Sequence, residues 1–164
     1  DNMLQFYYRF VAPYHSILEL GRIDTVMRLI ETQFSLYVGD CWEHLCRQYV
    51  SGNEIDGIIY NMASRWWGKI FPNDNKEGTM IELDIVAESF DKKHILIGEC
   101  KWTNGEDAQR LAHSLSEKAQ SLPFVKRGQQ VHLVLFLKRT PEHPEAARYF
   151  LPENIVSSHA FRRE

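Results

Sequence analysis

Two acidic residues and a lysine stand at spacings that favour metal-assisted phosphate chemistry. Glu99 and Lys101 are two residues apart in a segment with the pattern of a strand, so their side chains point to the same face, about 7 Å apart. Asp84 belongs to the preceding extended segment. If residues 91 and 92 form a two-residue hairpin loop, Asp84 lies directly opposite Glu99 on the neighbouring strand.

This pairing predicts a cation between the two carboxylates. Like charges directly opposite each other on neighbouring strands are destabilising. A divalent cation would offset the repulsion between Asp84 and Glu99, and Mg²⁺ binds such a carboxylate pair while retaining several waters. Lys101 would then orient or help to deprotonate a water and stabilise charge developing on a phosphate.

The same pattern allows a second interpretation. The three residues would then form the solvated face of a hairpin, with Lys101 bridging two surface acids for about 0 to 1 kcal/mol. A turn longer by one residue would also place Asp84 and Glu99 on opposite faces of the sheet.

The strands that position these residues are predicted from alternation and apolar runs. In residues 81–88 the apolar Ile81, Leu83, Ile85 and Ala87 alternate with Glu82, Asp84, Val86 and Glu88, which indicates a strand with one charged face. After a turn at 89–93, residues 94–102 form a strand whose centre is apolar on both faces and is therefore central. Residues 130–137 are apolar enough to form a buried strand parallel to it.

Helices are predicted on both sides of the hairpin in the sequence. Thr103 and Glu106 match the capping box of an amphipathic helix that ends before Pro123. Upstream, apolar residues recur at helical spacing in 6–11 and 25–34.

A third upstream helix is expected at 41–50, where Asp40 would cap the first amide groups. Glu43 then falls in its first turn. The resulting order of helices and strands, with a right-handed crossover, predicts an α/β fold in three layers (α/β/α) around a central mixed sheet. We expect an N-terminal helical segment, 1–38, packed on a domain of residues 39–164.

Composition bounds the function. The 164 residues are 44% hydrophobic, which is enough for one domain with a substantial core. A net charge of −3 gives no global attraction to nucleic acid, so any DNA contact must come from local patches. No Gly-rich phosphate loop is present, so ATP hydrolysis is not expected of this chain.

Three cysteines are too few for a disulfide framework, which favours a reducing, cytoplasmic compartment. The longest apolar runs are far shorter than the ~20 residues that cross a bilayer, so no membrane is expected as a partner. The chain opens without Met on a dense aromatic stretch, and we expect it to be a piece of a longer protein.

The segments Glu-Leu-Asp-Ile-Val-Ala (82–87) and Ile-Gly-Glu-Cys-Lys-Trp (97–102) resemble the D…ExK core of the PD-(D/E)xK nuclease superfamily. Together with Phe10-Val11 and Trp66-Trp67-Gly68, they are similar to the nuclease-like domain of unknown function that closes many archaeal-type AAA ATPases. The similarity covers about residues 1–136, and it implies a restriction-endonuclease-like fold.

The resemblance also implies roles. Asp84 and Glu99 would bind Mg²⁺ or Mn²⁺, the backbone carbonyl of Cys100 would be a third ligand, and Lys101 would be the catalytic lysine. Glu43 would be an additional acidic catalytic residue, although the macrodipole alone also favours a Glu in a first helical turn.

The implied function is a Mg²⁺-dependent endodeoxyribonuclease that hydrolyses DNA phosphodiesters at the C-terminus of a AAA-type ATPase. An upstream ATPase and a winged-helix part of the same protein would be its partners and would contribute DNA binding. The alternative is a non-catalytic DNA-binding, regulatory or interaction module that keeps the nuclease fold.

Other residues fit either function or packing. Trp66 and Trp67 would stack on bases or belong to the core. The pairs at 126–127 and 138–139, each a lysine and an arginine, would contact phosphates or simply solubilise the ends of elements.

Overall fold

A computed structural model describes residues 1–71 and 77–157, and the chain divides into two compact units, Asp1–Trp42 and Glu43–Glu164. No helix in the described part of the chain is long and apolar enough to cross a membrane.

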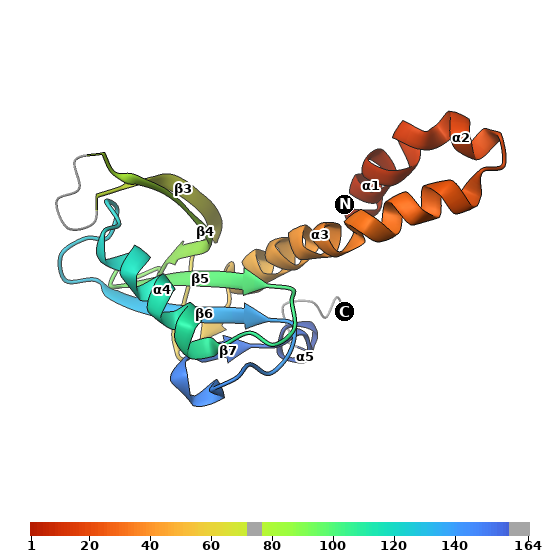
Figure 1. Cartoon of the computed structure of the whole chain (residues 1–164). Coiled ribbons are helices and arrows are strands. Elements are labelled where there is room, and N and C mark those ends of the chain that lie inside the picture. Colours follow the sequence, from red (N-terminus) through yellow and green to blue (C-terminus); the bar gives the residue numbers. More distant parts are fainter. Residues whose placement is uncertain (72–76, 158–164) are drawn as a thin grey trace. The chain divides into compact units, whose positions relative to one another are not determined.

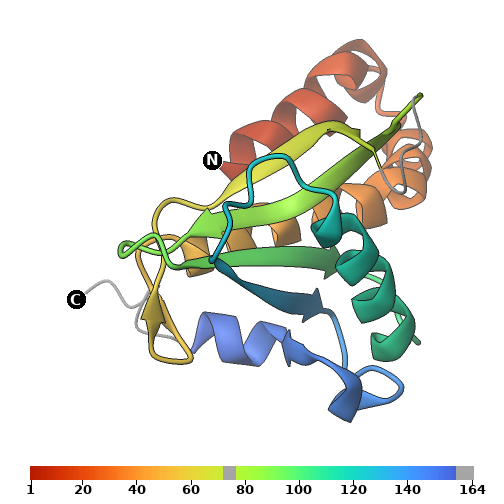
Figure 2. The same cartoon turned by 90° about the vertical axis from the view of Figure 1, so that its left-hand side faces the viewer.

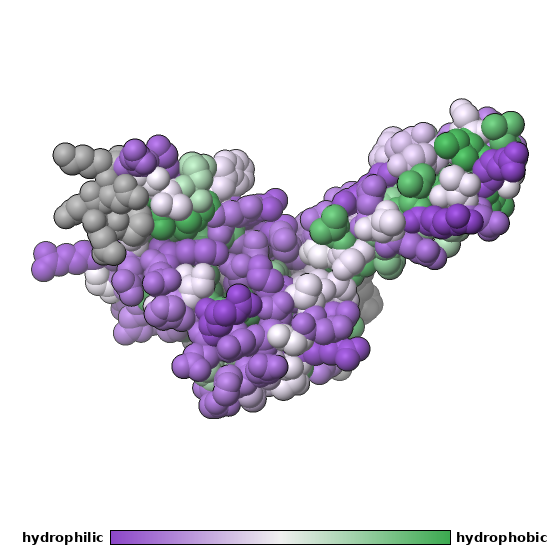
Figure 3. Space-filling model, in the orientation of Figure 1, coloured by the Kyte–Doolittle hydropathy of each residue, from purple (hydrophilic) through white to green (hydrophobic). Residues whose placement is uncertain are grey.

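The first unit consists of helical turns held by aromatic rings. The rings of Phe6, Phe10 and Tyr37 contact one another with centroids 5.1 to 5.7 Å apart, and Phe10 is almost fully buried. Figure 3 shows hydrophobic patches among the hydrophilic residues on the surface of this unit. Its elements are α1 (Asn2–Phe6), a π-helical turn (Tyr7–Val11), a 3₁₀ turn (Ala12–Tyr14), α2 (His15–Glu19) and the first part of α3 (Ile23–Val50).

Helix α3 runs without a break through Gly39, so the prediction of two separate helices at 25–34 and 41–50 was wrong. A glycine inside a helix costs only about 1 kcal/mol, which tertiary packing easily overrides. The prediction of an Asp40 cap was wrong for the same reason, and its carboxylate instead pairs with Arg9 at 2.8 Å. Glu43 lies in the helix body, so the macrodipole of a first turn does not explain it.

The second unit is built on a five-stranded mixed sheet in the order β3-β4-β5-β6-β7. The pairs β3–β4 and β4–β5 are antiparallel, and β5–β6 and β6–β7 are parallel. The predicted antiparallel hairpin and parallel strand are therefore confirmed. The strands are β3 (Ser64–Ile70), β4 (Thr79–Glu88), β5 (His94–Lys101), β6 (Gln130–Leu137) and β7 (Arg148–Phe150), beside a small hairpin of β1 (Glu54–Ile55) and β2 (Ile58–Ile59).

Helices cover both faces of this sheet (Figures 1 and 2). On one face, α4 (Ala108–Gln120) buries Leu111 and Leu115 against a core that includes Ile97. On the other, residues 43–50 of α3 pack on the sheet, with the Tyr49 ring 5.4 Å from that of Phe150. The predicted three-layer α/β class is confirmed. A 3₁₀ turn (Pro144–Ala146) and α5 (Pro152–Val156) complete the unit.

The register of the central hairpin is the predicted one. Ile85 lies opposite Gly98 and Glu88 opposite Ile95. The connection is longer than the expected two residues: the last hydrogen bond joins Ser89 N–H to the His94 carbonyl, so residues 90–93 form the loop. The loop gains one residue from each strand, so the pairing of the remaining residues and the faces to which they point are unchanged.

The prediction of how helix α4 (Ala108–Gln120) begins was wrong. Helix α4 is capped by Asp107, whose carboxylate accepts from the amides of Gln109 and Arg110. Thr103 and Glu106, the expected capping box, hydrogen-bond to each other through their side chains instead. An Asp directly before the first helical residue satisfies the free amides without them.

Candidate functional site

Asp84 lies at an irregularity in β4. The pairs Trp66–Leu83 and Ser64–Val86 span two residues on β3 but three on β4, so β4 carries an extra residue at this point. Such bulges re-aim side chains and end regular pairing, and they are common beside active sites. The paired residues of β4 and β5 accordingly stop at Ile85 and Gly98, one step before Asp84 would meet Glu99.

The Asp84 side chain turns onto the backbone of β5. Its Oδ2 accepts a hydrogen bond of 2.8 Å from the amide of Cys100, the residue between Glu99 and Lys101. Asp84, Glu99 and Lys101 therefore lie close together, as predicted. The contact runs through the Cys100 amide, however, and the carboxylates of Asp84 and Glu99 are not directly opposite each other.

Each carboxylate oxygen of Glu99 forms an ion pair with a lysine. Lys101 Nζ lies 2.7 Å from Oε1, and Lys118 Nζ lies 3.2 Å from Oε2. The Glu99 side chain is only 14% exposed, so both contacts are partly shielded from water. Lys118 was not predicted. Its signal in the sequence is a charged residue three positions after Leu115, on the buried side of an amphipathic helix.

Glu43 enters the site from α3 together with Arg47, which was also missed. Arg47 Nη1 lies 3.4 Å from Glu43 Oε2 and donates a 2.9 Å hydrogen bond to the backbone carbonyl of Asp84. This guanidinium satisfies a main-chain acceptor inside the irregular stretch of β4. The spacing of Glu43 and Arg47, four residues on one helix, was the available signal.

Burial raises the pKa of Asp84 from 3.8 to about 6. The Cys100 amide opposes this rise, the charges of Glu99 and Glu43 add to it, and Lys101 again opposes it. For Lys101, burial acts to lower the pKa, but the Glu99 contact and the charges of Asp84 and Glu106 outweigh it and the pKa is raised. Asp84 therefore changes charge near pH 6, while Lys101 stays protonated.

The thiol of Cys100 is buried away from solvent. Burial, followed by a hydrogen bond with Cys46, raises its pKa well above the ordinary thiol value. A thiol held in this neutral form is a poor metal ligand. Coordination by the backbone carbonyl of Cys100 stays a prediction.

The oxygen donors suit a hard cation. Within residues 1–71 and 77–157, no three His, Cys, Asp or Glu side chains converge closely enough to hold a metal by themselves. A Mg²⁺ site does not require three, because one or two carboxylates, waters and substrate phosphates complete it. Asp84 and Glu99 meet that requirement, provided that Lys118 or Lys101 yields one oxygen of Glu99.

The two tryptophans considered for base stacking, Trp66 and Trp67, differ in their exposure to solvent. Trp66 packs edge-on against Phe124 with ring centroids 5.1 Å apart, whereas Trp67 is 68% exposed. Of the basic pairs, Lys138 places its ammonium 5.7 Å above the ring of Trp102, and Lys126 pairs with Glu88.

Sequence comparisons place the chain beside uncharacterized archaeal and bacterial proteins. The model of the family DUF234, described as "Archaea bacterial proteins of unknown function", matches residues 7–117. That range contains Glu43, Asp84, Glu99 and Lys101 and ends one residue before Lys118.

The uncharacterized protein MJECL04 of Methanocaldococcus jannaschii is 24% identical over 125 residues, which cover 73% of the chain and 26% of that protein. The chain thus spans about a quarter of the length of this relative. No solved structure matches the chain.

Proposed function

The chain belongs to the DUF234 family of archaeal and bacterial proteins, and from its acidic cluster we propose that residues 43–164 form a metal-dependent nuclease that hydrolyses DNA phosphodiesters. The observation that carries the proposal is the Asp84 carboxylate bound to the amide of Cys100, between Glu99 and Lys101. A purely structural hairpin face has no need to hold a half-buried aspartate whose ionisation is costly.

Each residue has a proposed part. Asp84 and Glu99 would hold Mg²⁺ or Mn²⁺, with the carbonyl of Cys100 as third ligand and Glu43 as a further acid at the edge. When bound, the ion would supply Lewis-acid stabilisation of a phosphate oxygen and a more acidic water.

Lys101 contributes a fixed positive charge. Its raised pKa keeps it protonated, so we assign it to stabilising charge that develops on the phosphate rather than to removing a proton from water. Glu99 holds its ammonium in place through the 2.7 Å contact.

The structure also motivates a second candidate, a non-catalytic DNA-binding or regulatory module. Both oxygens of Glu99 are already compensated by lysines, so the cluster is balanced without a metal. Such a module would bind DNA without cutting it.

We further propose that the rest of the protein supplies an AAA-type ATPase and a winged-helix part. Support comes from the resemblance of the motifs and from the length of the relative, about three quarters of which lies outside the match. ATPase activity of the full-length protein that changes on adding DNA would support this arrangement, and a full-length sequence without a Walker A motif would contradict it.

The proposal is tested by incubating the chain with labelled single-stranded and duplex DNA in Mg²⁺ or EDTA. Cleavage should require the metal and be abolished by Lys101→Ala. Lys126→Ala is the matched control, because Lys126 forms an exposed ion pair with Glu88 away from the site. Metal-dependent cleavage that survives Lys101→Ala removes this residue from the chemistry, and binding without cleavage by the wild type selects the regulatory module.

A further inference from the structure

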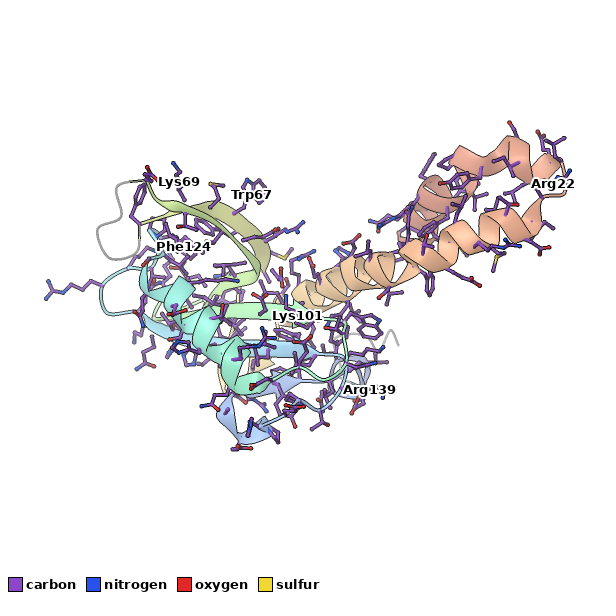
Figure 4. All side chains as sticks on the ribbon, in the orientation of Figure 1. Arg22, Trp67, Lys69, Lys101, Phe124 and Arg139 are labelled. Atoms are coloured by element: carbon purple, nitrogen blue, oxygen red, sulfur yellow. The ribbon has the colours of Figure 1, made fainter. Side chains whose placement is uncertain are left out.

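One face of the β3–β4 hairpin carries a tryptophan, Trp67, that is 68% exposed and lies outside the hydrophobic core of the described residues. Arg65, Trp67 and Lys69 alternate along β3 and are all exposed. The register places Trp67 opposite Glu82 and Lys69 opposite Met80 on β4, and Met80 is 62% exposed. In Figure 4, Trp67 and Lys69 extend on the outer side of β3, away from α4, whereas Phe124 lies near the end of that helix.

The neighbouring tryptophan shows that exposure of Trp67 is specific to this face. Trp66 points to the α4 side, where its ring lies over Gly68 and against Phe124. A Cβ at position 68 would be 2.5 Å from the Trp66 ring, so glycine is needed for this packing. The core uses one tryptophan of the pair and leaves the indole face of the other in solvent.

Positive charge flanks the exposed ring. Arg65 and Lys69 each lie two residues from Trp67, about 7 Å along the strand. Arg65 pairs with Glu82, while Lys69 forms no ion pair with any residue of the described part of the chain. A flat aromatic ring between two cations matches bases that alternate with phosphates.

The face shares strand β4 with Asp84 but lies on the side of the sheet away from α4, whereas Glu99 contacts Lys118 of α4. Glu82, opposite Trp67, precedes Asp84 by two residues on β4.

We propose that the face formed by Arg65, Trp67, Lys69 and Met80, the β3–β4 face, binds single-stranded DNA, with a base stacked on Trp67 and phosphates near Lys69 and Arg65. The inference rests on the proposed nuclease function and specifies its substrate as an unpaired strand. A free base face is required for stacking, and in a duplex those faces are already covered by neighbouring base pairs.

Binding is measured by fluorescence anisotropy of a labelled single-stranded DNA with the 164-residue chain in EDTA, so that no cleavage interferes. Trp67→Ala should weaken binding roughly 5- to 150-fold, the range for loss of one stacked base. Trp67→Tyr should retain most of the affinity. Phe90→Ala is the matched control, because Phe90 is a 62% exposed aromatic residue at the opposite end of β4 and should have no role.

Salt dependence tests the phosphate contact separately. Lys69→Ala should reduce the slope of log K against log salt by about 0.7, and Lys93→Ala, an exposed lysine in the β4–β5 turn, should leave it unchanged. Equal affinities of wild type and Trp67→Ala overturn the inference, as does equal loss in Phe90→Ala. Binding of duplex DNA or RNA as tight as that of single-stranded DNA overturns the assignment of the ligand.

The outcomes separate this inference from the proposed function. Trp67-dependent binding without cleavage in Mg²⁺ supports DNA binding at the β3–β4 face and overturns the proposed nuclease activity. If Trp67→Ala leaves metal-dependent cleavage of single-stranded DNA unchanged, the nuclease activity is supported and DNA binding at the β3–β4 face is overturned.

Discussion

The amide of Cys100 donates to the Asp84 carboxylate at 2.8 Å, just beyond the point where the regular pairing of β4 and β5 ends. The acid is therefore held by the backbone of the strand that carries Glu99 and Lys101. Because it is also half-buried, its ionisation is costly, which raises its pKa to about 6.

Asp84→Asn should stabilise the protein above pH 6. The folded state binds the Asp84 proton more tightly than the unfolded state does, so the free energy of unfolding should fall as pH rises from about 4 to about 6. A pKa change from 3.8 to about 6 corresponds to about 3 kcal/mol. Asparagine keeps an oxygen that accepts from the Cys100 amide, and because it does not ionise, the variant should not show this decrease in the free energy of unfolding.

Urea unfolding at several pH values measures this effect. Wild type and Asp84→Asn should converge near pH 4 and separate above pH 6, with the variant more stable. Parallel stability curves would show that Asp84 ionises as easily in the folded chain as in the unfolded one.

Lys118→Ala should strengthen metal binding. Lys118 neutralises Glu99 Oε2 and repels a cation approaching that oxygen, so its removal should tighten Mg²⁺ binding by about 10-fold, given the strength of charge interactions at partly buried sites. Calorimetry on the variant and on Lys126→Ala checks this. Weaker binding in Lys118→Ala would instead mean that the lysine supports the ligand geometry of Glu99.

Arg47→Ala should destabilise the second unit. Arg47 satisfies the Asp84 carbonyl and lies beside Glu43, and an unsatisfied buried acceptor costs about 1 to 3 kcal/mol. Arg148→Ala breaks an exposed pair with Asp56 and should cost only about 0 to 1 kcal/mol. Equal losses in urea unfolding would contradict a structural role for the Arg47 contact.

Two Gly→Ala substitutions should change the free energy of unfolding in opposite directions. Gly68→Ala brings a Cβ against the Trp66 ring and should cost about 1 to 3 kcal/mol through overpacking. At Gly39, inside α3, an added Cβ meets nothing within 4 Å, so Gly39→Ala should stabilise by about 0.5 to 1 kcal/mol. Thermal unfolding distinguishes them, and stabilisation by Gly68→Ala would contradict the packing of Trp66.

Patterning within single segments predicted the centre of the fold. Strands β4, β5 and β6 follow from alternation and apolar runs, and the hairpin register follows from the parity of the turn. This sufficed to place Asp84 near Glu99 and Lys101 on β5.

Features that depend on packing between segments were not predictable in the same way. The irregular residue in β4 belongs to its pairing with β3, and the Arg47 contact forms only when α3 lies on the sheet. The edge strand β3 was not assigned, because its two adjacent tryptophans obscure the alternation that separates Trp66 from Trp67. Lys118 looked like an ordinary helix lysine, and its partner is 19 residues away.

Calorimetric titration of Mg²⁺ or Mn²⁺ at pH 7.5, with and without single-stranded DNA, tests the central claim most directly. Wild type should show saturable binding that Asp84→Asn abolishes and that weakens below pH 6 as Asp84 becomes protonated. Absence of binding in the wild type even with DNA, or equal binding in Asp84→Asn, would contradict a metal site at Asp84 and Glu99.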